Sequence, residues 1–522
     1  MARSESYTKN MRRKLLLSIL SAPLLLALPR TVRATSTDFA APDAAVARLA
    51  ERLARLAEDG LDPNLYAIPA PALAGAEPER YRTELMRAAQ AVLSDLLLGR
   101  VAALRGRVDL RRDPASVPVA AWMAELATSA EPAEVIERAS NLPPEARALK
   151  AELALYRAAA AAGGWPRITG NLRRTLEPGS TDSARVPQLR ARLAAFDPAL
   201  VEGPAASSPV YDERLVAAVR RFQESEGLEP DGRIGGITWT ALNTPIEAKI
   251  NQLRVALDMR RGQGAAPTER RIEVNIPHFR LRLLEGDRVE REMAVIVGRR
   301  DRQTPLLNVR LTAVQFNPPW GVPERNARED LLPRLQRNPE SVRNSGFRIY
   351  ERVDGQVIEV DPTLIDWSGY SRNRFPYFIR QDAGDRNALG RLKFVMPNND
   401  DIFMHDTPDR HLFRRGQRAF SSGCIRLERP MELLSDALSG TLGWDEARMN
   451  SAMASRATRT VPVARPIPVR LHYTTVIVEG GRVIMRPDIY DLDAEYARAL
   501  DRATSQRVAS SEGGAGRGTA LR

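Results

Sequence analysis

The apolar pattern of this chain changes its period near residue 260, and this change divides the sequence into two structural classes. Upstream, apolar residues recur at the spacing of amphipathic helices, as in residues 43–60 and 81–98. Downstream, apolar and polar residues alternate in short runs, as in residues 271–276 and 279–284, which is typical of β-hairpins. A chain of 522 residues is also too long for one core, because single cores stop growing at about 250–300 residues. We therefore expect a multidomain α+β protein.

The helical half is expected to contain three units. Its Ala/Leu/Arg-rich helices form a scaffold domain over residues 35–205 and carry no catalytic constellation. A small three-helix module follows over residues 206–245, with an apolar helical face, an Asp231-Gly232 turn and Trp239 near its end. Residues 246–268 then form a linking helix.

The strand-forming half predicts a mostly antiparallel β domain over residues 269–465. A polar insertion, residues 320–376, interrupts it, and it is rich in Arg, Asn and Pro. Long insertions in compact domains are often functional, so we interpret this one as a lid over a site, with a surface excursion as the alternative. Residues 466–502 are expected to add a hairpin and a helix, and residues 503–522 to be a disordered tail.

The first 34 residues have the form of a signal peptide. The basic residues Arg12, Arg13 and Lys14 precede an apolar run over residues 15–28, which is followed by small residues. We therefore expect export to the periplasm, and an uncleaved membrane anchor stays open as an alternative.

The net charge of +12 favours an anionic partner. Nucleic acid, a membrane surface and an acidic cell-wall polymer all fit this charge. The sequence has no zinc-ligand spacing, no aromatic stripe of the kind that binds RNA and no arginine-rich recognition helix, so we do not expect nucleic-acid binding.

Cys424 is the only cysteine of the chain, and the residues around it predict a nucleophile. A thiol attacks as thiolate, so it needs a base or nearby positive charge, and His405 and Arg426 offer both. Gly423 allows a sharp turn through which backbone amides could face an oxyanion. The alternative is a small buried hydrophobic residue, which is common for free cysteine.

Several motifs occur in a fixed order and carry a family resemblance. They are Asn387-Ala-Leu-Gly-Arg-Leu-Lys-Phe394, Phe403-Met-His-Asp-Thr-Pro408 and Ser421-Ser-Gly-Cys-Ile-Arg426. The sequence resembles the YkuD-type L,D-transpeptidases, and residues 221–239 resemble the small peptidoglycan-binding domain found beside cell-wall enzymes. The layout is similar to the large periplasmic YcbB-like branch. This resemblance implies an L,D-transpeptidase fold, a peptidoglycan substrate, a thioester intermediate and sensitivity to carbapenems.

The resemblance also implies roles for single residues. Cys424 matches the nucleophile and His405 the histidine that deprotonates it. Gly423, with Cys424, falls where the family places the backbone amides of its oxyanion hole. Asp406 follows the base directly, and either its carboxylate or its backbone carbonyl could orient the imidazole.

A second group of residues is expected to bind substrate: Arg426, Ser421, Ser422, Phe403 and Trp320. Arg426 could instead hold the loop. Ser422 is a departure, because many family members have His at this position, so a second histidine role is excluded here. No metal and no organic cofactor is expected, since thiol, imidazole and amides supply nucleophile, proton transfer and charge stabilisation.

The function expected from these residues is formation of 3→3 cross-links between peptidoglycan stem peptides, which would serve as acyl donor and acceptor. The same acyl-enzyme would give an L,D-carboxypeptidase if water resolved it, or would attach a protein lysine to the wall. A non-catalytic wall-binding scaffold is the alternative from another class. The sequence does not decide what resolves the thioester.

Overall fold

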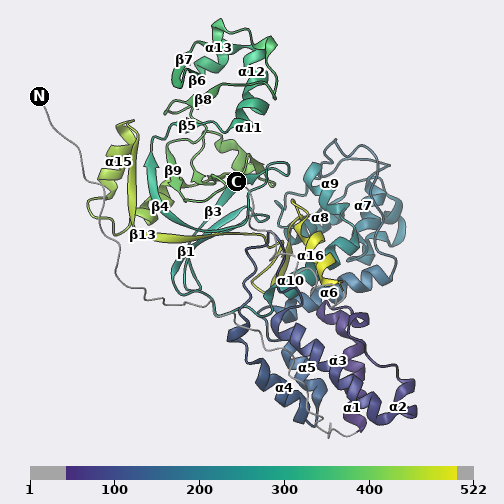
Figure 1. Cartoon of the computed structure of the whole chain (residues 1–522). Coiled ribbons are helices and arrows are strands. Elements are labelled where there is room, and N and C mark those ends of the chain that lie inside the picture. Colours follow the sequence, from purple (N-terminus) through teal and green to yellow (C-terminus); the bar gives the residue numbers. More distant parts are fainter. Residues whose placement is uncertain (1–42, 503–522) are drawn as a thin grey trace, which may run out of the picture. The chain divides into compact units, whose positions relative to one another are not determined.

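The computed structural model describes residues 43–502 (Figure 1). The predicted signal peptide or anchor and the predicted disordered tail lie outside the described residues. Within residues 43–502, none of the helices has the length and apolar character that a membrane span requires.

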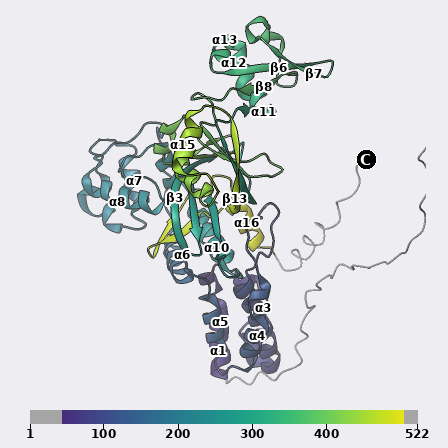
Figure 2. The ribbon, with the colours of Figure 1, turned by 90° about the vertical axis from the view of Figure 1, so that its left-hand side faces the viewer.

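The helices that follow residue 43 form a layered bundle in which α1, α3, α4 and α5 pack on one another (Figure 2). Helix α1 buries Val46, Leu49 and Leu53, which lie on one face at helical spacing. The helices of this region are α1 Asp43–Ala54, α2 Ala72–Ala76, α3 Pro78–Leu98, α4 Val119–Thr128, α5 Pro132–Ser140 and α6 Ala146–Ala161. The predicted helical scaffold is therefore present.

The small helical module comprises α7 Val186–Leu193, α8 Glu213–Ser225 and α9 Gly236–Leu242. Asp212 caps α8, because its carboxylate accepts the Leu215 N–H at 2.9 Å. Gly232 adopts φ +77°, and its carbonyl accepts the Tyr211 hydroxyl at 2.6 Å. This tight turn lets α9 return onto α8, so that Trp239 is buried between them.

The core of this module starts earlier than the predicted boundary at residue 206. Ile168, Leu176 and the apolar face of α7 share one core with α8 and α9. Two short helices cannot bury their apolar faces on each other alone, so the segment around α7 completes the module. The eight residues of α7 were too few to give a clear periodic signal.

The linking helix, α10 Ile246–Arg260, is buried on nearly all sides. It packs against α6 of the scaffold and against α16 Leu492–Leu500 near the chain end. It therefore joins parts of the chain that are far apart in sequence.

The large sheet has the strand order β11-β3-β12-β10-β9-β4-β13-β1-β2, and an additional pairing of β2 with β3 closes it on itself. Most neighbouring strands are antiparallel, as predicted; β1–β13, β10–β12 and β11–β3 are parallel. The strands are β1 Arg270–Asn275, β2 Arg280–Glu285, β3 Arg288–Gly298, β4 Leu307–Phe316, β9 Leu392–Val395, β10 Met404–His405, β11 Ala419–Ser421, β12 Ile425–Leu427 and β13 Arg459–His472. Helices α14 Pro430–Leu438 and α15 Glu446–Ala454 contribute to the same apolar core.

The polar insertion forms a folded subdomain with its own sheet, in the order β5-β8-β6-β7, and its own apolar core (Figure 1). Its last strand pairs with two others and ends at Gln381, so the insertion extends beyond the predicted boundary at residue 376. Its elements are β5 Trp320–Gly321, α11 Glu324–Asn326, a π-helical turn Ala327–Leu331, α12 Leu332–Arg337, α13 Pro339–Asn344, β6 Phe347–Val353, β7 Gln356–Val360 and β8 Phe378–Gln381.

The predicted domain boundary at residue 465 falls inside strand β13. This strand runs from Arg459 to His472 between β4 and β1, so it belongs to the closed sheet. Of residues 466–502, which were expected to add a hairpin and a helix, residues 466–472 therefore belong to β13. The C-terminal hairpin itself consists of β14 Val476–Glu479 and β15 Arg482–Met485, and α16 follows it.

Candidate active site

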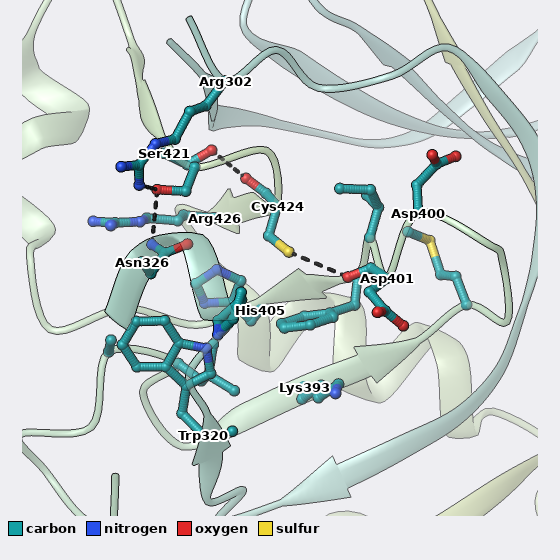
Figure 3. Close-up of a pocket in the computed structure, with 18 of the residues that line it drawn as sticks. Arg302, Trp320, Asn326, Lys393, Asp400, Asp401, His405, Ser421, Cys424 and Arg426 are labelled. Atoms are coloured by element: carbon teal, nitrogen blue, oxygen red, sulfur yellow. Dashed lines mark hydrogen bonds between the residues drawn. The ribbon is translucent and has the colours of Figure 1, made fainter. Parts of the chain in front are cut away.

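A cavity of about 860 Å³ opens at the end of strands β9, β10 and β12. Cys424 and His405 both line it, and so do Trp320 and Asn326 of the insertion. In Figure 3, Arg302, Asn326 and Arg426 lie on one side of Cys424, whereas Asp400 and Asp401 lie on the other. The two arginines and the two aspartates thus lie on different sides of the thiol.

Cys424 directly precedes β12, at the end of the loop that leaves β11. Its Sγ donates to the Asp401 backbone carbonyl at 3.7 Å (Figure 3). Burial raises the pKa of the Cys424 thiol to about 11; a backbone hydrogen bond from Phe403 and the charge of Lys393 act in the opposite direction. At neutral pH the thiol therefore stays protonated until a base accepts its proton.

Asp401 holds its carbonyl at the thiol because its backbone is left-handed, with φ +54°. The side chain of Asn398 fixes this loop: its amide donates to the carbonyls of Met396 and Ile402, and its oxygen accepts the N–H groups of Asp400 and Ile402. Non-glycine residues in this conformation are uncommon and gather at functional sites.

His405 lies in β10 and is 4% exposed. Its Nδ1 donates to the Asp406 carbonyl, which leaves Nε2 as the basic nitrogen of the neutral ring. Burial lowers the pKa of His405 to about 3, the charges of Arg426 and Lys393 add to this effect, and hydrogen bonds to the backbone of Asp406 and Leu389 oppose it. The ring is therefore neutral at pH 7. Among the described residues, no hydrogen bond joins it to the thiol.

The geometry selects one of the two roles left open for Asp406, because its backbone carbonyl orients the imidazole. Its carboxylate instead accepts the N–H groups of Arg391 at 2.9 Å and Thr407 at 2.7 Å and pairs with Arg410. The carboxylate thus holds the turn that presents the carbonyl to His405.

The Gly423 amide, which the sequence predicted as an oxyanion donor, makes a hydrogen bond within the loop. Gly423 has φ +122°, and its N–H donates to the Ser421 hydroxyl at 3.1 Å, so this amide is already occupied. The Ser421 hydroxyl in turn donates to the Cys424 carbonyl at 2.6 Å. Ser421 is 3% exposed and braces the loop; it also lines the cavity, and its contact with substrate stays a prediction.

The Cys424 amide is available as a backbone donor of this loop. Its N–H has no hydrogen-bond acceptor within the part of the chain that the structure describes. An unoccupied amide beside a nucleophile is the arrangement that an oxyanion hole requires.

Two residues without a predicted role hold Ser422. Its hydroxyl accepts from Arg302 at 2.9 Å and from Asn326 at 3.0 Å. Arg302 also pairs with Glu329 and Asp330 in the π-helical turn, at 2.6 Å each. It therefore joins the insertion to the nucleophile loop, which we define as residues 421–424. The sequence motifs do not include Arg302, so they gave no indication of this role.

The remaining predicted substrate-binding residues all line the cavity. Arg426 pairs with Asp409 at 2.8 Å, so part of its charge is used to hold the loop after β10. The Phe403 ring packs on the His405 ring, with centroids 5.6 Å apart. Trp320 packs edge-on against Phe347 of the insertion.

Lys393 is a further residue that the sequence motif contained but to which no role was assigned. It is the cross-strand partner of His405, and its Nζ lies 3.9 Å from the centre of the Phe403 ring. Burial lowers its pKa, and the charges of Cys424 and Asp401 oppose this change. No salt bridge to Lys393 occurs among residues 43–502, so its charge is available to the cavity.

Three family models match separate parts of the chain. Residues 269–450 match an L,D-transpeptidase catalytic domain, residues 182–242 a "Putative peptidoglycan binding domain", and residues 37–153 a scaffold domain. The second match begins upstream of α7, in agreement with the core of the small module.

A relative from Haemophilus influenzae, named "Putative L,D-transpeptidase", is 40% identical over 252 residues. The match covers 48% of this chain and 50% of the length of that relative. A crystal structure of the L,D-transpeptidase from Xylanimonas cellulosilytica is 14% identical, with 58% of this chain and 100% of that chain covered. Its TM-score of 0.18 is too low to bear on the fold. The chain is therefore similar to the YkuD family of L,D-transpeptidase catalytic domains over residues 269–450, and to a putative peptidoglycan-binding domain over residues 182–242.

Proposed function

We propose that the chain is a cysteine-dependent L,D-transpeptidase that joins peptidoglycan stem peptides by 3→3 cross-links in the periplasm. The observation that carries the proposal is one cavity lined by a thiol, a neutral imidazole and an unoccupied backbone amide. The peptidoglycan-binding domain supports the choice of substrate, and the signal-like pattern of the first 34 residues supports export.

In the first step, His405 accepts the thiol proton as Sγ of Cys424 attacks the carbonyl carbon that precedes the terminal D-alanine of a donor stem. The Cys424 N–H stabilises the oxyanion. The bond from that carbon to the D-alanine nitrogen then breaks, and His405 returns the proton to the departing amine. A thioester and free D-alanine result.

In the second step, the side-chain amine of an acceptor stem gives a proton to His405 and attacks the thioester carbon. A C–N bond forms, the C–S bond breaks, and the thiolate regains its proton from the imidazole. The amine must enter beside the thiol, where the exposed carboxylates of Asp400 and Asp401 face the cavity.

The test is to incubate the purified protein with sacculi that contain tetrapeptide stems, digest the product and weigh the muropeptides. We expect dimers linked 3→3 and free D-alanine, and neither with Cys424→Ala. Tripeptide monomers without dimers would replace the proposal by an L,D-carboxypeptidase. If native protein shows no mass adduct after exposure to a carbapenem, Cys424 is not an acylated nucleophile and a wall-binding scaffold remains.

A further inference from the structure

The nucleophile loop is connected through Thr304 to Tyr490, which lies outside residues 269–450, the segment matched by the catalytic-domain family. The Gly423 carbonyl accepts the Thr304 hydroxyl at 2.7 Å. The same hydroxyl accepts the Gly298 N–H at 2.8 Å, at the end of β3. The Thr304 N–H donates to the hydroxyl of Tyr490 at 3.1 Å, and this hydroxyl donates to the Gly298 carbonyl at 2.5 Å.

These four residues form a closed set of hydrogen bonds in the protein interior. Thr304 is 2% and Tyr490 5% exposed, and both glycines are buried. A Cβ on Gly298 would lie 2.2 Å from the Arg302 carbonyl, so the backbone approaches too closely here for any other residue. Burial raises the pKa of Tyr490, so its hydroxyl keeps the proton that it donates.

Tyr490 is in turn fixed by contacts with Tyr473. Its N–H donates to the Tyr473 hydroxyl at 2.9 Å, and the two rings stack with centroids 5.6 Å apart. The Tyr473 hydroxyl donates to Asp488 at 2.6 Å. The Asp488 carboxylate also accepts N–H groups of Leu492 and Asp493 at 3.0 Å each, where α16 begins.

The direction of the Cys424 amide follows from this support. A peptide unit is planar and trans, so its C=O and N–H point in opposite directions. The Gly423 carbonyl and the Cys424 N–H belong to one peptide unit. Because Thr304 fixes the carbonyl toward the interior, the N–H must point away from Thr304. This N–H has no acceptor among the described residues.

We propose that Tyr490 is a positioning residue, which acts through Thr304 to orient the Cys424 amide toward the oxyanion formed on the acyl donor. This inference rests on the proposed function. Tyr490 does not touch the substrate; it determines where the donor of the oxyanion hole points. The C-terminal segment thereby becomes part of the catalytic unit.

The experiment compares two reactions of the same thiol in the full chain. Acylation by meropenem forms an oxyanion, whereas alkylation by iodoacetamide does not and depends on the thiolate alone. Loss of one oxyanion donor lowers the reaction rate about 100- to 1,000-fold. Tyr490→Phe only loosens this donor, so we expect acylation to slow by at least ~10-fold. Alkylation at fixed pH should stay within about twofold.

Tyr496→Phe is the matched control. Its hydroxyl is also buried in the C-terminal segment and donates to Asp258 at 2.7 Å, without contact to the nucleophile loop. Both variants should lose similar thermal stability, whereas only Tyr490→Phe should lose acylation. If meropenem acylated folded Tyr490→Phe at the rate of the native protein, the inference would be overturned. It would also be overturned if the rates of acylation and alkylation fell by the same factor.

Thr304 gives a second pair of variants if Tyr490→Phe does not fold. Thr304→Val keeps the side-chain shape but loses the hydroxyl, so acylation should fall while alkylation persists. Thr304→Ser keeps the hydroxyl and should restore acylation, and failure of this pair to differ would overturn the inference. If meropenem does not acylate native protein that iodoacetamide alkylates, the proposed function falls, and this inference falls with it.

Discussion

Replacement of Arg302 by methionine should loosen the insertion from the nucleophile loop. The Arg302 side chain is 3% exposed and pairs with Glu329 and Asp330, which are 29% and 41% exposed. Breaking a fully buried pair costs about 3–5 kcal/mol, but exposed partners regain water, so we expect ~2 kcal/mol here. Since about 1.4 kcal/mol corresponds to a factor of ten, local opening should become ~30-fold more frequent.

Hydrogen exchange measures this opening directly. In Arg302→Met, amides of residues 327–337 should exchange ~30-fold faster, while those of the closed sheet keep their protection. Arg325→Met is the control, because Arg325 contacts Glu329 from a side chain that is 53% exposed, and its loss should cost no more than ~1 kcal/mol. If the exchange rates were unchanged in Arg302→Met, or changed equally in both variants, Arg302 would not hold the insertion to the nucleophile loop.

Three other outcomes follow from the site and the small module. Because the pKa of Cys424 is about 11, iodoacetamide alkylation should rise ~10-fold per pH unit between roughly pH 7 and 9.5 without a plateau, and Lys393→Met should slow it at each pH. Asp406→Ala leaves two N–H groups without their acceptor and Arg410 without its ion-pair partner, so it should lower the free energy of unfolding by ~1–3 kcal/mol and slow acylation; an unchanged acylation rate would contradict the support of His405. Trp239→Ala should lower the free energy of unfolding of the small module by ~3–5 kcal/mol and abolish co-sedimentation of the protein with sacculi. Retained co-sedimentation would show that wall binding does not depend on this core.

The parts of the fold that periodic patterns can specify were predicted from the sequence. The change from helical to alternating patterns correctly placed the helical scaffold and the mostly antiparallel sheet, and ordered motifs brought Cys424 and His405 into one domain. Both residues do line one cavity, but their catalytic roles stay predictions. Short elements such as α7 and the two-residue strand β10 contain too few residues to show a period.

The contacts that arrange the site could not be predicted because they join segments far apart in the chain. Arg302 reaches the nucleophile loop and the insertion at once, and Tyr490 reaches Gly298 and Thr304 from beyond β15. The engagement of the Gly423 amide with Ser421 depends on backbone dihedral angles, and no side-chain pattern reports these. The sequence thus gives residue types for the chemistry, whereas the donors' directions come from the tertiary structure.

Strand β13 determines how much of the chain the catalytic domain needs. The family match ends at residue 450, but β13, residues 459–472, lies between β4 and β1 and pairs with both. Without it the closed sheet would open and leave two apolar edges with unpaired backbone groups. Since β13 leads directly into the segment that carries Tyr490, the residues that complete the sheet also connect the nucleophile loop to α16 and, through it, to α10. The folded unit around the cavity therefore extends from β1 to α16, and the nucleophile loop is held by Thr304, which Tyr490 supports from the segment before α16.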